Sequence, residues 1–131
     1  MHHSVFSLEA SLCLYRGEEL FLGAQQIRLL RQVLVDGSIH AAANNLKMSY
    51  QHAWHMLDKL NRLSPVPVIV RQKGGKDGGG CSLSPYGLKL LDMYLKKEKE
   101  VLQLLKRSDS ELDSCFFLDR RYSCQSISLV F

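Results

Sequence analysis

The side chains best suited to chemistry lie in the segment SYQHAWHMLDKLNRL, at positions 49–63. On a helical wheel, one arc of this segment is apolar and the other is polar. The polar arc holds Gln51, His52, His55, Lys59 and Arg62, along with Asp58. Glutamine can make paired hydrogen bonds to adenine in the major groove, histidine can bond base edges or phosphates, and lysine and arginine supply positive charge. This arc is therefore suited to reading duplex DNA.

The position of each side chain along the expected helix indicates what it would touch. Residues near the N-terminus of a recognition helix usually reach deepest into the groove. The candidate base contacts are Ser49, Tyr50, Gln51, His52 and His55. Lys59 and Arg62 lie farther along the helix, and we expect them at phosphates.

Other interpretations of the same helix stay open. An ordinary solvated face would be equally polar. His52 and His55 have a spacing that can chelate a metal ion, but no third ligand lies near them in the sequence, so we expect no metal site. Trp54 could stack on a nucleobase, although its place at the edge of the apolar arc favours packing. Two rival functions remain: a metal or small-ligand sensor, and a protein-interaction module that has kept the fold but lost DNA binding.

The segment RQKGGKDGGGC, at positions 71–81, holds five of the nine glycines in the chain. A phosphate-binding P-loop needs G-x-x-x-x-G-K followed by Ser or Thr. Here Asp77 follows Lys76, and no glycine lies five residues before Gly75. No G-x-G-x-x-G register fits, and no carboxylate pair, Ser-His-Asp set or Cys-His set is indicated. We therefore expect neither an enzyme nor a bound cofactor.

The elements that must position these segments follow from periodicity and capping. We expect a strand over 5–15, helices over 25–35, 39–46 and 50–63, a hairpin of strands 68–71 and 81–83, and a long helix over 85–107. Ser38, Ser49 and Ser84 are the expected N-caps, and Gly37 ends the first helix. Two helices joined by a short turn and followed by a small hairpin predict a winged helix-turn-helix, mainly α with a small β component.

The expected long helix runs for roughly six turns and carries an apolar stripe at 88, 91, 94/95, 101/102 and 104/105. Such a stripe usually packs on a partner helix, so we expect a homodimer through residues 85–107. The DNA-binding domain would then span 1–107. The tail, 108–131, turns acidic and ends in SCQSISLVF, which could be a strand paired with 5–15 across the dimer or a partner-binding segment.

Composition narrows the class of protein. With 131 residues and 46% hydrophobic content, the chain can build one folded domain. Its apolar runs are too short to cross a bilayer, and its N-terminus lacks the basic start of a signal peptide. The four scattered cysteines form no C-x-x-C pair, which indicates free thiols in a reducing cytoplasm. Residues 25–107 carry 14 Lys and Arg against 6 Asp and Glu, which favours a polyanionic partner.

Two stretches carry a family resemblance. The segments GSIHAAANNLKMSYQHAWHMLDKLNRL and VRQKGGKDGGGCSLSPYGLKLLDMY closely resemble the N-terminal DNA-binding domain of ModE-type molybdate-responsive regulators, and the LysR-type winged helix-turn-helix more distantly. The distinctive parts are GGK-x-GGG followed by L-[ST]-x-x-G, at 74–87, and S-Y-x-x-A-W, at 49–54. The resemblance covers residues from about 20 to about 105.

The resemblance implies a role for each segment. Helix 50–63 would be the recognition helix, the glycine hairpin would be the wing, and the helix over 85–105 would contribute to a homodimer. The implied wing contacts to the DNA backbone are Arg71, Lys73 and Lys76, with the amides of Gly74 and Gly75. No residue matches a molybdate-binding position of that family, so the resemblance carries over no effector, and the effector stays unknown.

Overall fold

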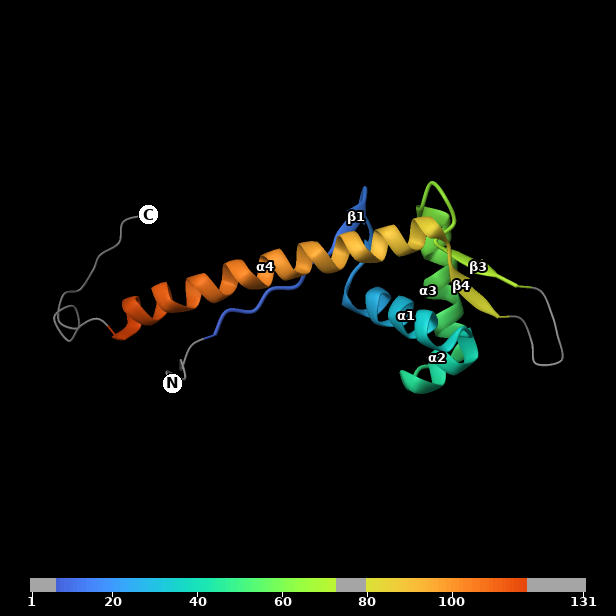
Figure 1. Cartoon of the computed structure of the whole chain (residues 1–131), viewed down its shortest axis with the longest axis horizontal. Coiled ribbons are helices and arrows are strands. Elements are labelled where there is room, and N and C mark those ends of the chain that lie inside the picture. Colours follow the sequence, from blue (N-terminus) through green and yellow to red (C-terminus); the bar gives the residue numbers. More distant parts are fainter. Residues whose placement is uncertain (1–6, 73–79, 118–131) are drawn as a thin grey trace. The chain divides into compact units, whose positions relative to one another are not determined.

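The computed structural model describes residues 7–72 and 80–117, and Figure 1 shows their course. The elements are β1 (Leu14–Arg16), β2 (Glu19–Leu22), α1 (Ala24–Asp36), α2 (Ile39–Asn45), α3 (Tyr50–Leu63), β3 (Ile69–Arg71), β4 (Cys81–Leu83) and α4 (Pro85–Phe117). The chain divides into two compact units, residues 11–98, and residues 1–10 with 99–131. The first unit holds every described strand and helices α1 to α3. This order confirms the predicted winged helix-turn-helix, mainly α with a small β component.

The N-terminal strand differs from the prediction. We expected a strand over 5–15, but β1 is only Leu14–Arg16 and pairs antiparallel with β2, Glu19–Leu22. Gly17, with φ 63°, turns the chain directly after β1, so only the residues next to this turn find a partner strand. The register shifts between Leu14 and Tyr15, Leu14 still pairs with Leu22, and residues 7–13 form no strand.

Capping residues define ends of helices α1, α2 and α3. α1 ends at Gly37, whose φ of 67° lets its N–H donate to the Val33 carbonyl. The Ser38 hydroxyl oxygen accepts from the Ala41 N–H at 3.3 Å, and the Ser49 hydroxyl oxygen accepts from the His52 N–H at 3.1 Å. These bonds satisfy helix-end donors that would otherwise lack partners. The capping roles predicted for Gly37, Ser38 and Ser49 are confirmed.

The core lies between helices α1 to α3, the first part of α4 and the wing strands. Its fully buried side chains include Leu22, Leu29, Leu30, Val33, Ala42, Ala53, Leu57, Leu60, Val68 and Tyr94. On α2, the small side chains of Ala42 and Ala43 are buried and let this helix lie close to its neighbours. The apolar arc of α3 thus faces the core, which leaves its polar arc on the surface.

The wing is the hairpin of β3 and β4. These strands pair antiparallel, with Ile69 opposite Leu83 and Arg71 opposite Cys81. One further bond, from the Gln72 N–H to the Gly80 carbonyl at 2.8 Å, extends the pairing toward the tip. The predicted hairpin is confirmed, although its first strand begins one residue later than expected. The tip, residues 73–79, lies outside the described residues.

Helix α4 begins as predicted and ends later. Ser84 caps it by accepting the Gly87 N–H at 2.9 Å, while the Ser84 hydroxyl donates to the Pro67 carbonyl at 2.6 Å. Farther along, the Tyr94 hydroxyl donates to the Leu12 carbonyl at 2.7 Å. The helix continues to Phe117, so the prediction that it ends at 107 is wrong. The segment after 107 is acidic and serine-rich, but it contains no Gly or Pro to stop a helix. The strand expected near the C-terminus lies outside the described residues.

Candidate nucleic-acid interface

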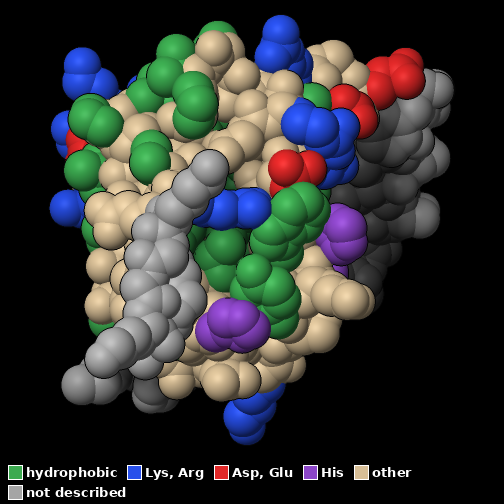
Figure 2. Space-filling model, turned by 90° about the vertical axis from the view of Figure 1, so that its right-hand side faces the viewer, with side chains coloured by type: hydrophobic (Ala, Val, Ile, Leu, Met, Phe, Trp, Pro, Cys, Tyr) green, Lys and Arg blue, Asp and Glu red, His purple; other side chains and the backbone are tan. Residues whose placement is uncertain are grey.

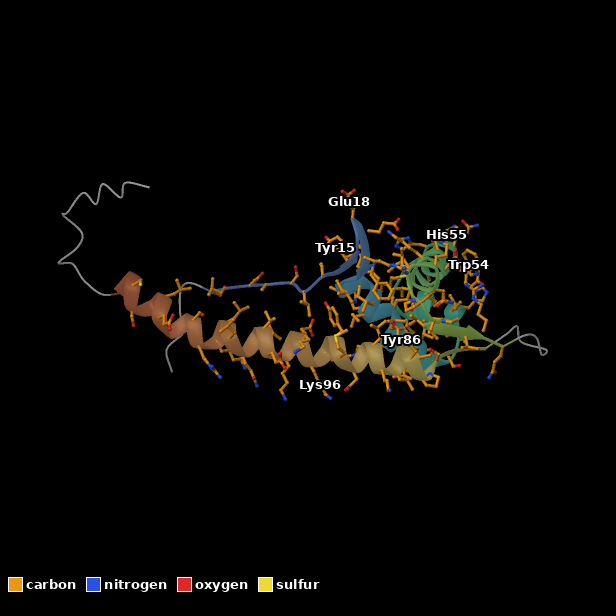
Figure 3. All side chains as sticks on the ribbon, turned by 90° about the horizontal axis from the view of Figure 1, so that it is seen from above. Tyr15, Glu18, Trp54, His55, Tyr86 and Lys96 are labelled. Carbon is orange, nitrogen blue, oxygen red and sulfur yellow. The ribbon has the colours of Figure 1, made fainter. Side chains whose placement is uncertain are left out.

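The polar arc of α3 is exposed over the first half of the helix. Ser49, Tyr50, Gln51, His52 and His55 are all exposed, whereas Ala53, Leu57, Leu60 and Leu63 are buried. The structure therefore leaves all five predicted base-contact residues exposed at the start of one helix. Figure 2 views one face of the molecule, where histidine side chains lie beside a hydrophobic strip and basic side chains. In Figure 3, Trp54 and His55 lie on the same side of the domain, while Lys96 points away from α4 toward the other side.

The two aromatic residues of α3 are held by neighbours outside the helix. Tyr50 is 39% exposed, and its ring stacks on that of His40 from α2, with centroids 3.9 Å apart and planes 9° from parallel. Trp54 is half-buried, and the Arg71 guanidinium of β3 lies 4.6 Å from the centre of its ring. A guanidinium over an indole face is an attractive cation–π arrangement. Trp54 thus packs against the wing strand, as its place at the edge of the apolar arc predicts.

A partly buried polar contact joins α3 to the wing. The side-chain oxygen of Asn61 accepts the N–H groups of Val68 and Ile69 at 2.9 and 3.0 Å, and its nitrogen donates to the Ile69 carbonyl at 3.1 Å. One amide side chain therefore satisfies three backbone groups where the chain enters β3. A second tie runs from the Cys81 N–H to the Gly37 carbonyl at 2.9 Å. Together these bonds fix the wing base to α3 and to the turn between α1 and α2.

The two basic residues farther along α3 differ in their surroundings. Arg62 pairs with Asp58 at 3.6 Å, and both side chains are largely in solvent. Such surface pairs contribute about 0–1 kcal/mol, so a phosphate can replace Asp58 as the partner of Arg62. Lys59 is half-buried and lines a cavity of about 240 Å³ together with His52 and His55. Among the described residues, no group of three or more His, Cys, Asp or Glu side chains is placed to hold a metal ion.

The sequence comparisons agree with this geometry. Residues 24–88 match the family described as bacterial regulatory helix-turn-helix protein, lysR family. These residues form a LysR-type helix-turn-helix domain. The matched range begins at the first residue of α1 and ends in the first turn of α4, so it contains the recognition helix and the wing.

Curated relatives place this LysR-type domain in the ModE-like group. The chain is 38% identical over 112 residues to the transcriptional regulator ModE of Haemophilus influenzae, covering 83% of this chain and 44% of the relative. It is 39% identical over 92 residues to the molybdenum transport protein ModE of Azotobacter vinelandii, covering 70% and 34%. It is 31% identical over 122 residues to the DNA-binding transcriptional dual regulator ModE of Escherichia coli, covering 90% and 47%. The chain matches less than half the length of each of these relatives, and the resemblance to ModE regulators is confirmed.

Several wing residues of this ModE-like domain lie outside the described residues. Lys73, Gly74, Gly75 and Lys76, expected at the DNA backbone, belong to the segment 73–79. Arg71 is described, exposed, and directed over Trp54.

The described helices contain none long and apolar enough to cross a membrane.

Sequence reasoning missed two residues of this surface. His40 reads in the sequence as an ordinary residue on a helix surface, and only the packing of α2 against the start of α3 reveals its stacking partner. Asn61 lies between the polar and apolar arcs of α3, and nothing in its spacing indicates that three backbone groups of the wing strand bond to it. A half-buried Asn near the end of an amphipathic helix is a weak signal for such a role.

Proposed function

We propose that this ModE-like protein is a sequence-specific transcriptional regulator that binds duplex DNA as a homodimer in the cytoplasm. The observation that carries the proposal is the set of exposed side chains at the start of α3, residues 49–52 and His55, within a LysR-type helix-turn-helix domain. In such a domain α3 enters the major groove, its first turn reads bases, and the wing lies beside it on the backbone. Lys59, Arg62 and Arg71 would meet phosphates, with Lys73 and Lys76 at the wing tip. No catalytic residue enters this proposal.

Helix α4 supports the homodimer. Leu88 and Leu102 are 44% and 47% exposed, and half-buried Leu95 lies seven residues from each. Leucines at this spacing form one seam along a helix, and such seams pair helices in coiled coils. A second copy of α4 would cover this seam. Two recognition helices related by a twofold axis would then read two half-sites of a near-palindromic duplex.

The decisive experiment selects duplexes from a random pool with the purified protein and measures their affinity at several salt concentrations. We expect a near-palindromic site whose binding weakens steeply with salt, because bound phosphates release counterions. Replacing both Gln51 and His52 with Ala should relax the sequence preference, while light scattering still reports a dimer. Arg31→Ala, an exposed change on α1, is the control and should leave the preference intact.

The rival functions predict other results. An interaction module that has lost DNA binding would shift no duplex even at low salt. A metal sensor would carry stoichiometric metal after purification. If the selected sites show no symmetry and the double variant keeps the wild-type preference, α3 does not read the bases and the proposal is wrong.

A further inference from the structure

A small recess opens beside the first turn of α3, between α2 and the base of the wing. Its volume is about 160 Å³, and the side chains that matter for its chemistry are Ser38, His40, Tyr50, Arg71, Gln72 and Cys81. Pockets for cofactors or drug-sized ligands hold roughly 300–1,000 Å³. The recess is therefore too small for such a ligand and fits a single compact group.

The walls of the recess are held in place before any ligand arrives. On one side, the Tyr50 ring is stacked on His40 at 3.9 Å. On the other side, the Arg71 guanidinium lies with its carbon 4.6 Å from the centre of the Trp54 ring. A guanidinium stacked on an aromatic face still offers the N–H donors along its edge. A site whose donors are already ordered loses less conformational entropy when it binds.

The chemistry of the lining selects an anion. Arg71 contributes a full positive charge, and among the described residues that line the recess none is Asp or Glu. Burial raises the pKa of the Cys81 thiol more than the charge of Arg71 lowers it, so this thiol stays neutral at neutral pH. The hydroxyl groups of Ser38 and Tyr50 and the amide of Gln72 are further donors. One cation surrounded by neutral donors suits a phosphate group.

The place of the recess suggests which phosphate would occupy it. Tyr50 is the first residue of α3 and precedes Gln51 and His52, the expected base contacts. When a recognition helix lies in the major groove, the phosphates of the flanking strand pass beside its first turn. Arg71 and Gln72 belong to the wing base, which the Cys81–Gly37 hydrogen bond fixes against the turn before α2.

We propose that this recess seats one phosphate of the DNA backbone in each half-site, bound by Arg71 and the Tyr50 hydroxyl, with His40 as the positioning residue that holds the Tyr50 ring. Tyr50, predicted from the sequence to contact bases, would then contact the backbone instead. The inference rests on the proposed DNA binding. In this proposal, residues of the wing base and the start of α3 hold a DNA phosphate, and α2 supports them. This contact would limit how far the start of α3 enters the major groove. An inorganic phosphate ion shares the chemistry of the backbone group, so the test separates the two sources.

The test asks whether removing the Arg71 side chain and neutralising one DNA phosphate have the same, non-additive effect on affinity. Duplexes carrying a neutral methylphosphonate at successive single positions are titrated with wild-type protein and with Arg71→Ala. We expect wild-type affinity to fall about tenfold or more at one position in each half-site, as for loss of a charge-assisted hydrogen bond. Arg71→Ala should bind unmodified DNA correspondingly less well, lose nothing further at that position, and reduce the salt slope by about one. Arg31→Ala, which removes an exposed arginine from α1, should match wild type.

Two further measurements keep the proposal falsifiable. Inorganic phosphate is titrated into the protein alone, and the amide signals of Tyr50 and Gly80 are followed by NMR. Shifts that vanish in Arg71→Ala support the recess as an anion site. If wild type binds no duplex, the proposed function fails; such shifts would then assign the recess to free phosphate, and their absence would overturn the anion site as well. Equal losses at every methylphosphonate position in Arg71→Ala would overturn the assignment of one phosphate to this recess.

The role of His40 is tested by the paired variants His40→Phe and His40→Ala. Phenylalanine keeps a flat ring against Tyr50, whereas alanine removes the stack. We expect His40→Ala to lower affinity several-fold and His40→Phe to restore most of it. If both variants are equally weak while the fold is unchanged by circular dichroism, the imidazole itself makes the contact and the positioning role is wrong.

Discussion

Gly87 lies at the closest approach between α4 and the strand that enters the wing. A Cβ atom at this position would lie 2.4 Å from the carbonyl oxygen of Val68 and 3.1 Å from a methyl group of the same residue. The oxygen belongs to the backbone, so no rotation of a side chain can relieve the contact. We predict that Gly87→Ala strongly destabilises the domain, although alanine is the better helix former.

The magnitude follows from what must move. The Val68 carbonyl accepts the Ser84 N–H at 2.9 Å, and it must retreat by at least 0.6 Å before the new contact reaches 3.0 Å. That movement stretches the hydrogen bond beyond useful length, which costs about 1 kcal/mol. Forcing an extra methyl group into a packed site costs about 1–3 kcal/mol more. The free energy of unfolding should therefore fall by about 2–4 kcal/mol, and Tm by on the order of 10 °C.

Circular dichroism during chemical and thermal unfolding measures the change, at one protein concentration because dimerisation would shift both curves. Gly23→Ala is the matched control. There a Cβ would meet side-chain atoms alone, the nearest being the Gln26 oxygen at 3.1 Å, which can turn away, and the backbone is extended. The control should lose less than about 1 kcal/mol. If Gly87→Ala is no less stable than Gly23→Ala, the close approach of α4 to the wing strand is wrong.

Two other side chains give predictions about stability. Asn61→Ala should cost about 2–4 kcal/mol in denaturant unfolding, since it leaves two backbone N–H groups of the wing strand without an acceptor. Asn61→Asp should cost less because it keeps an acceptor, and equal losses would contradict these bonds. Burial chiefly raises the pKa of the Tyr94 phenol, with smaller contributions from the charges of Glu98 and Cys13. The neutral phenol therefore stabilises the fold fully below its unfolded pKa of about 10, and this contribution is lost as pH rises through the folded pKa. Tyr94→Phe should cost about 1 kcal/mol at neutral pH and flatten this alkaline loss; an unchanged alkaline profile would show that Tyr94 is not its source.

Local patterns predicted most of the fold. Helix α3 has the predicted bounds, and serines before α2, α3 and α4 predicted the caps at Ser38, Ser49 and Ser84. These features depend on neighbours within a few residues, so the sequence contains their cause. The predicted α4 was too short because a serine-rich, acidic composition was interpreted as the end of a helix, although such residues only weaken one. The strand over 5–15 was wrong because pairing requires a partner strand, and alternation alone does not supply one.

Contacts between elements were much less predictable. The exposed face of α3 could be predicted from its wheel, but the stack of His40 on Tyr50 joins residues from two helices. The L-[ST]-x-x-G pattern was recognised as a family signature, whereas its cause is the cap at Ser84 and the space that Gly87 leaves for the Val68 carbonyl. Such pairings depend on how the helices and the wing pack together, which periodicity along one element does not encode.

The ties at the wing base have a consequence for regulation. The Asn61 side chain and the Cys81–Gly37 bond hold the wing base to the helices. The recognition helix and the wing strands are therefore joined into one DNA-binding unit. A regulatory signal could not bend the hairpin at its base without breaking these hydrogen bonds. It could instead change the separation or the relative rotation of the two DNA-binding units in a dimer. The spacing of half-sites that the dimer fits would then be the regulated property. Each recognition helix and its wing would keep the same arrangement in the bound and released states.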